Sequence, residues 1–198
     1  MLFRSCSSLK EIELSNNITA INERAFSGCS SLTSIVIPET VTCIGLSAFY
    51  NCSSLESITL PFIGQYSDGS GYDHLGYIFG TTSYSSNSSY VPTSLKEVNV
   101  TTTTIYSYAF YGCSYIEKIN LNEDIYYIYD YAFFNCSSLC IVNLPSNITI
   151  IDDYVFYGCS SLKEIELSDN ITTINDGAFS GCSSLTSIEI PDTVTIIG

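Results

Sequence analysis

A repeat unit of about 23 residues runs through the chain, and a fixed period of this length is typical of solenoids, in which each repeat forms one turn. This feature constrains the fold more than any other. A cysteine followed by Ser-Ser, or once by Ser-Tyr, marks each unit at the same spacing, except between Cys52 and Cys113, where the interval is longer. The recurring positions are Cys6, Cys29, Cys52, Cys113, Cys136, Cys159 and Cys182. The longer interval predicts one repeat that has lost its cysteine and carries an insertion at about 62–91.

Each repeat follows the pattern A-F-x-x-C-S-S-L-x-x-I-x-L-P, followed by [IV]-T-x-I. The segment L-x-x-I-x-L ends in alternating apolar and polar residues, which predicts a short strand with one buried face. Proline ends several of these segments because it cannot donate a hydrogen bond to a sheet. About eight such segments predict a single domain over residues 1–198 with about eight parallel strands. At Ala-Phe we expect a short helix or 3₁₀ turn that directs the ring into the core.

The in-phase motifs A-F-x-x-C-S-S-L, I-x-L-P and [IV]-T-x-I resemble the BspA-like leucine-rich repeats, a family of cell-surface proteins from anaerobic bacteria and parasitic protists. The resemblance covers the whole chain. Within the insertion, Gly76-Tyr77-Ile78-Phe79-Gly80 resembles a variant of bacterial members in which this segment replaces A-F-x-x-C. The family implies an α/β-type leucine-rich repeat fold. This is a curved right-handed solenoid with a parallel sheet on its concave face and short 3₁₀, helical or irregular convex segments. The family also implies an extracellular or cell-surface location.

Composition excludes several classes of function. Twenty acidic residues against six lysines and arginines give a net charge of −14, so the clustered basic side chains that bind nucleic acid are missing. The sequence has no apolar run of about 18 residues and predicts no membrane insertion. His74 is the only histidine, and no set of acid, base and nucleophile is evident. We therefore expect no enzyme activity, no catalytic residues, no cofactor and no metal site.

The cysteines are expected to be free thiols. Seven of the nine share one inward repeat position, where neighbours would stack about 4.8 Å apart. A disulfide needs specific side-chain geometry as well as proximity. The pattern therefore favours small buried side chains with thiols facing the backbone.

The outward positions of the predicted strands form the candidate binding surface on the concave face. The candidate residues there are Glu13, Thr59, Asn99, Asn120, Asn143, Glu166 and Glu189. The competing interpretation is a solvated sheet face that serves only solubility. A second candidate surface is rich in tyrosine, which offers a large contact area with a polar tip. Its candidate residues are Tyr106, Tyr108, Tyr126, Tyr127 and Tyr129. Here the competing interpretation is that stacked rings cover neighbouring turns.

These features favour a non-enzymatic adhesion or binding module that recognises a protein or glycan, including molecules of a host surface. The alternative is a structural protein that assembles head to tail. The chain begins and ends within repeats and has no polar capping repeat at either end, although solenoids normally carry one. We expect a fragment of a longer array. A neighbouring copy that completes the broken repeat remains the alternative.

Overall fold

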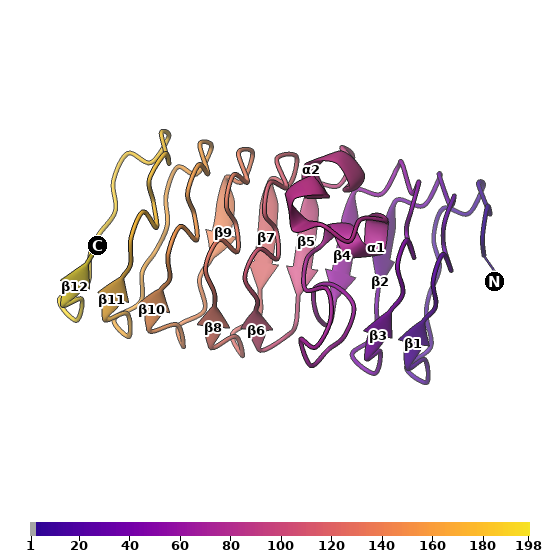
Figure 1. The fold of residues 1–198 in the computed structure, drawn as a ribbon, viewed down its shortest axis with the longest axis horizontal. Coiled ribbons are helices and arrows are strands. Elements are labelled where there is room, and N and C mark those ends of the chain that lie inside the picture. The colour runs from indigo at the N-terminus through magenta and orange to yellow at the C-terminus, as the bar shows by residue number, and fades with distance from the viewer. Residues whose placement is uncertain (1–2) are drawn as a thin grey trace.

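The computed structural model describes residues 3–198 and shows a parallel β-solenoid of about eight turns (Figure 1). The turns stack in one row along the long axis, with the N-terminus at one end and the C-terminus at the other (Figure 1). This architecture confirms the predicted fold class. The strands come from two places in the repeat, so the solenoid has two separate strand rows.

The first strand row is a five-stranded parallel sheet in the order β2-β4-β5-β7-β9. Its strands are β2 (Ser34–Val36), β4 (Ser57–Leu60), β5 (Glu97–Val100), β7 (Lys118–Leu121) and β9 (Ile141–Asn143). The register pairs the same repeat position in successive turns, as in Ile58 with Val98 and Val98 with Ile119. All three side chains are buried, as the alternating pattern predicts.

The expected number of strands in this sheet, eight, is too high. Within residues 3–198, the equivalent segments 11–13, 164–166 and 187–189 form no strand. All three segments lie in turns near the ends of the row. In those turns the second strand row carries the parallel pairing between neighbours.

The second strand row lies at [IV]-T-x-I, where the sequence predicted an apolar pair but no strand. Its two-residue strands are β1 (Ala20–Ile21), β3 (Cys43–Ile44), β6 (Thr104–Ile105), β8 (Tyr127–Ile128), β10 (Ile150–Ile151), β11 (Thr173–Ile174) and β12 (Ile196–Ile197). They pair in parallel as β1-β3, β6-β8 and β10-β11-β12. From β1 to β11 the second residue of each strand is a buried isoleucine, so this row closes another side of the core.

Of the short helix or 3₁₀ turn expected at Ala-Phe, the regular repeats form no helix but a series of hydrogen-bonded turns with bonds such as Cys136 N to Phe133 O at 3.1 Å, three residues apart. The amides of this Ala-Phe corner bond to the next turn: Phe133 N donates to Val155 O at 3.0 Å and Phe156 N to Ala178 O at 2.9 Å. Positive backbone φ angles on either side of the corner, such as 55° at Asn135, accompany this arrangement. Glycine and asparagine adopt such angles more readily than other residues. This explains why Gly or Asn precedes most of the repeated cysteines.

Stacked phenylalanine rings run through the core beside the corner. Phe110 and Phe133 have ring centroids 5.4 Å apart, and Phe133 and Phe156 have centroids 5.2 Å apart at an interplanar angle of 11°. All three side chains are fully buried. This inward position of the Ala-Phe ring agrees with the sequence prediction.

The repeated cysteines lie beside this ring stack with their thiols on the backbone. Cys136 donates from Sγ to Phe110 O at 3.1 Å, and Cys159 to Phe133 O at 3.2 Å. All nine cysteines are free, as predicted. Burial raises the pKa of the Cys52 thiol to about 12 and also raises that of Cys136. These thiols therefore stay protonated and act as packing groups.

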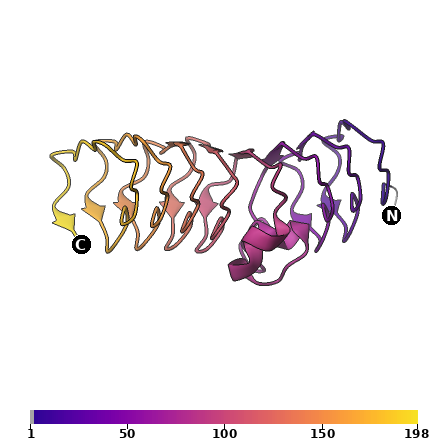
Figure 2. The ribbon, with the colours of Figure 1, turned by 90° about the horizontal axis from the view of Figure 1, so that it is seen from above.

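The insertion lies between β4 and β5 and protrudes from one side of the row (Figure 2). It contains α1 (Gly76–Phe79), η1 (Tyr84–Ser86) and α2 (Asn87–Tyr90). Phe49 N donates to Ile78 O at 2.9 Å, so Ile78-Phe79 occupies the place of Ala-Phe. The Phe79 ring continues the stack at 6.4 Å from Phe49 but is tilted by 52°.

We predict that Phe133→Ala destabilises the protein far more than Tyr127→Ala. Phe133 is fully buried, whereas Tyr127 is 59% exposed. Removing a buried phenylalanine ring typically costs about 3–5 kcal/mol, whereas exposed substitutions usually stay within about 0.5 kcal/mol. In a chain of this length each kcal/mol lowers Tm by roughly 2–4 °C. Thermal unfolding of the two variants measures the difference, and equal shifts would contradict the inward placement of the ring.

Candidate functional site

The outward side chains of β2, β4, β5, β7 and β9 form a surface that we call the sheet face. The strand register brings them into two columns. The first column contains Val36, Thr59, Asn99, Asn120 and Asn143, and the second contains Ser34, Ser57, Glu97, Lys118 and Ile141. Four of the predicted binding residues, Thr59, Asn99, Asn120 and Asn143, are thus neighbours in one column.

Hydrogen bonds link side chains across three strands of the sheet face. Asn120 donates from Nδ2 to Asn99 Oδ1 and to Glu97 Oε1, both at 2.6 Å. Asn99 in turn donates from Nδ2 to Thr59 Oγ1 at 3.3 Å. The bonds run in one direction along the column because each amide has both a donor and an acceptor atom. This network holds the central side chains of the face in defined positions.

An ion pair lies beside the network. Lys118 Nζ is 3.2 Å from Glu97 Oε1, and both side chains are more than a third exposed. The hydrogen bonds from Lys118 and Asn120 lower the pKa of Glu97 below its ordinary value. Exposed ion pairs of this kind add little stability, so the pair contributes mainly to the charge pattern of the face.

Apolar side chains lie at both ends of the sheet face. Val36 on β2 is 63% exposed and Ile141 on β9 is 47% exposed. Neither side chain is needed by the core, which takes Ile35 and Val142 from the same strands. The face therefore combines an ordered polar centre with two accessible apolar contacts.

Three predicted residues lie away from this arrangement. Glu13, Glu166 and Glu189 lie in the end turns, outside the five-stranded sheet. The structure thus aligns the central residues of the predicted column on one sheet. The glutamates at the two ends of the predicted column lie outside that sheet.

The predicted tyrosines divide between two places. Tyr108 belongs to the Ala-Phe corner, where its ring stacks on Tyr84 at 4.1 Å and on Tyr131 at 5.2 Å. A parallel row at the same corner contains Tyr111, Phe134 and Tyr157, with centroids 4.7–4.8 Å apart. Because these rings stack face to face, they present mainly edges and hydroxyls to solvent. The corner tyrosines therefore cover neighbouring turns.

The other predicted tyrosines lie along the second strand row. Tyr129 stacks on Tyr106 at 6.2 Å and on Tyr127 at 5.9 Å. Tyr106 also donates from its hydroxyl to Asp68 O in the insertion at 3.3 Å. Tyr126 and Tyr127 are more than half exposed. This group is accessible, but it lies on a different strand row from the sheet face.

His74 lies in a buried polar cluster in the insertion rather than in an exposed loop. It donates from Nδ1 to Asn87 Oδ1 at 2.8 Å, and Gly76 N donates to the same oxygen at 3.0 Å. Asn87 is fully buried and His74 is 5% exposed. Burial lowers the pKa of His74, which favours the neutral ring. Asn87 thereby connects the start of α2 to His74 and to the first residue of α1.

Comparison with known families decides the classification. The family described as "BspA type Leucine rich repeat region" matches with six copies over residues 1–68 and 83–198. The chain belongs to this family. The family match confirms the resemblance stated from the repeat motifs, and its gap lies within the insertion. No curated protein sequence matches the chain.

Solved structures of leucine-rich repeat proteins share the fold of this chain. A leucine-rich repeat protein from Bacteroides ovatus matches 98% of this chain and 49% of its own, with 25% identity and a TM-score of 0.64. A leucine rich cell surface protein from Faecalibacterium prausnitzii matches 98% of this chain and 51% of its own, with 33% identity and a TM-score of 0.51. The chain thus spans about half the length of these relatives.

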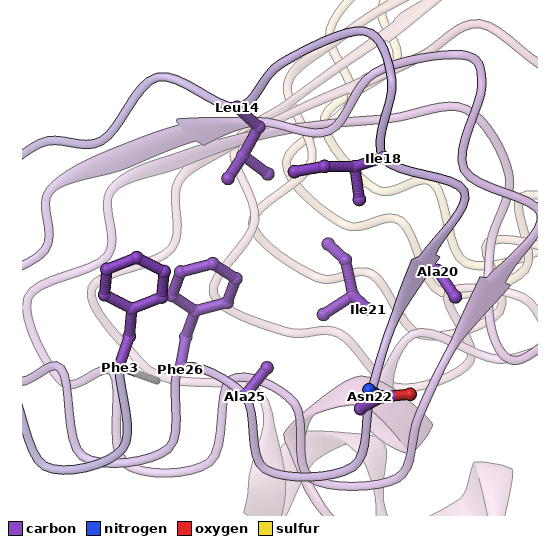
Figure 3. Close-up of a pocket in the computed structure, with 8 residues that line it drawn as sticks. All are labelled: Phe3, Leu14, Ile18, Ala20, Ile21, Asn22, Ala25 and Phe26. Carbon is purple, nitrogen blue, oxygen red and sulfur yellow. The ribbon is translucent and has the colours of Figure 1, made fainter. Parts of the chain in front are cut away.

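The BspA-type array exposes core side chains at its N-terminal end. A hollow of about 260 Å³ opens there. Figure 3 shows the parallel rings of Phe3 and Phe26, with Leu14, Ile18 and Ile21 across the hollow. At the other end, Ile196 and Ile197 of β12 are 57% and 67% exposed. Both ends of the described array therefore present apolar surface.

Residues 3–198 contain no group of three or more His, Cys, Asp or Glu side chains that could hold a metal ion. No helix in this range is long and apolar enough to cross a bilayer.

We predict that Asp73→Asn stabilises this BspA-type repeat protein at neutral pH but not in acid. Burial, with a smaller effect from Asp68, raises the pKa of Asp73 to about 6 from 3.8. Its Oδ1 has no hydrogen-bond partner within residues 3–198. Folding therefore favours the protonated carboxyl, and this stability is present below pH 3.8 and is lost as the pH rises through 6.

The measurement is Tm of the wild type and of Asp73→Asn at pH 7.5 and near pH 4. We expect the variant to have the higher Tm at pH 7.5 and the difference to shrink in acid. Asp192→Asn, which removes a charge at an exposed position, should not reproduce this pH dependence. A difference that is constant with pH would contradict the burial of the Asp73 charge.

Proposed function

We propose that the chain is a non-enzymatic binding module whose sheet face recognises a protein or a glycan outside the cell, including molecules of a host surface. The observation that carries the proposal is the hydrogen-bonded network of Asn120, Asn99 and Thr59 between the exposed Val36 and Ile141. An interface of this kind combines apolar contacts with polar groups in defined positions.

The rigidity of the face supports this proposal. Its side chains stand on a parallel sheet whose backbone bonds continue from β2 to β9, and the central amides are already linked to one another. A preorganised surface loses little conformational entropy when it binds a partner. The amides of Asn99 and Asn120 still have accessible surface for contacts with a ligand, since both residues are partly exposed.

The comparisons support the setting of the proposal. The Faecalibacterium relative is described as a cell surface protein, and the family consists of repeat arrays. We therefore place this chain in the same setting, as a secreted or surface-attached adhesion module.

We predict that Ile141→Asp weakens binding to a ligand of the sheet face at least about tenfold, whereas Ile150→Asp does not. The two isoleucines are similarly exposed, at 47% and 43%, but Ile150 lies on β10 in the second strand row. An aspartate buried in an interface without a partner loses its hydration, and a cost of about 1.4 kcal/mol already weakens binding tenfold.

The experiment uses an array of purified extracellular proteins and glycans, with each hit then titrated by biolayer interferometry. A hit that binds the wild type and Ile150→Asp equally, and Ile141→Asp at least roughly tenfold more weakly, supports the proposal. Hits that bind all three proteins equally, or no hit from the array, would contradict it.

A second candidate is head-to-tail assembly, favoured by the two apolar ends. Ile196–Ile197 of β12 and Ala20–Ile21 of β1 occupy the same repeat position, so β12 of one copy could pair with β1 of the next and cover the hollow at Phe3 and Phe26. We predict that light scattering then shows a mass that rises with concentration, and that Ile197→Glu abolishes the rise. A mass of one chain at all concentrations would contradict this candidate.

A further inference from the structure

A groove of about 610 Å³ lies beside the insertion, away from the sheet face. Its lining comes from residues 49–53 before the insertion, from Phe79 and residues 88–93 in the insertion and directly after it, and from Tyr115 in the next turn. The volume is in the usual range for sites that bind small molecules, roughly 300–1,000 Å³. Its lining shares no residue with the sheet face.

Three accessible tyrosines distinguish this groove from the corner rows. Tyr50, Tyr90 and Tyr115 are 43%, 43% and 42% exposed. None of them stacks on another aromatic ring within residues 3–198, whereas Tyr111 and Tyr157 at the corner both stack on Phe134. Unlike those of the corner rings, their faces are therefore not covered by another aromatic ring, although Lys96 approaches one face of Tyr115.

Tyr50 and Tyr90 converge on one glycine of the insertion. A Cβ atom placed on Gly80 would lie 3.1 Å from the Tyr50 ring and 3.5 Å from the Tyr90 ring. Gly80 has a φ of 122°, a backbone conformation that other residues rarely adopt. The turn after α1 thus brings together a tyrosine from a regular repeat and one from α2.

The polar lining of the groove is neutral. It consists of hydroxyl groups from Ser53, Ser88, Ser89 and Thr93 and the amide of Asn51. No Asp, Glu, Lys or Arg lines the groove, although the chain has twenty acidic and six basic residues.

An ion pair lies beside the Tyr115 end of the groove. Lys96 has its Nζ 5.9 Å from the centre of the Tyr115 ring. The same ammonium group lies 3.2 Å from the Glu117 carboxylate. This lysine is therefore already paired and does not give the groove a net positive charge.

We propose that this groove binds a neutral oligosaccharide. A sugar ring has an apolar C–H face that packs on an aromatic ring and hydroxyl groups around its edge. Serine and threonine hydroxyls and the asparagine amide can each donate and accept hydrogen bonds, which suits sugar hydroxyls. A charged ligand would meet no opposite charge in the lining. A proline-rich peptide also packs on aromatic grooves, but the number of hydroxyl groups here favours a saccharide.

The sequence shows how the groove arises from departures from the repeat. Tyr115 stands at the position that serine holds after the other six repeated Cys-Ser pairs, and Tyr90 lies in the insertion. The inference is independent of the function proposed for the sheet face, because it concerns separate residues and a separate ligand.

The test is titration with neutral tetrasaccharides by saturation-transfer NMR, using maltotetraose, cellotetraose, mannotetraose and N-acetylchitotetraose. A sulfated tetrasaccharide and a proline-rich decapeptide are the comparison probes. Tyr90→Ala and Tyr115→Ala remove the proposed contacts. Ile150→Ala is the matched control, because Ile150 is as exposed as Tyr90 and lies outside the groove. Circular dichroism and Tm of each variant establish that it is folded.

We expect at least one neutral tetrasaccharide to bind with a Kd of roughly 1 mM or below. Each tyrosine variant should raise this Kd about fivefold or more, and Ile150→Ala should leave the Kd unchanged. The sheet-face variant Ile141→Asp should also bind it normally, which separates this site from the sheet face. Absence of neutral saccharide binding, binding only of the sulfated sugar or the peptide, or binding unaffected by both tyrosine variants would overturn the inference.

Discussion

The structure depends on stacking turns of equal length in register. Because the regular repeats do not vary in length, each side chain lies next to the side chain at the same position in the neighbouring turn, as Ile35 does with Ile58 and Ile119 with Val142. The same alignment lets corner amides bond to carbonyls of the next turn and lets phenylalanine rings stack 5.2–5.5 Å apart in the regular repeats. A residue that suits this geometry once suits it in every turn, which explains the repeated sequence.

This regularity is also why much of the fold and part of the site could be predicted from the sequence. Period-two alternation identifies which residues of each strand point inward, and a fixed period then aligns the outward residues. The alignment of Asn120 with Asn143 follows from these two facts. Thr59 and Asn99 join the same column through the recurring strand motif, because the intervals on either side of Asn99 differ from the regular period. The free cysteines follow in the same way, because their shared position faces the core and its carbonyl groups.

Other features depend on contacts that periodicity does not encode. The second strand row has only two residues per strand, too few to produce an alternating pattern. The helices of the insertion, and the burial of His74 against Asn87, arise from a segment without a repeat. Tyr50, Tyr90 and Tyr115 line the same groove because the insertion places Tyr90 beside residues of the neighbouring repeats. Tyr115 was visible in the sequence as a departure from Ser-Ser, and that departure is the signal that could have indicated the groove.

Both proposed binding surfaces need a rigid array. The hydrogen bonds from the Ala-Phe corner of one turn to the next turn stabilise this array and were not predicted from the sequence. Amide hydrogen exchange measured by NMR tests them most directly. The amides of Phe133, Asn135 and Phe156 lie outside any strand but donate to the next turn, so they should exchange as slowly as that of Ile119 in the sheet. Exchange of these corner amides as fast as that of Asp169, in an exposed turn, would contradict this account of the array.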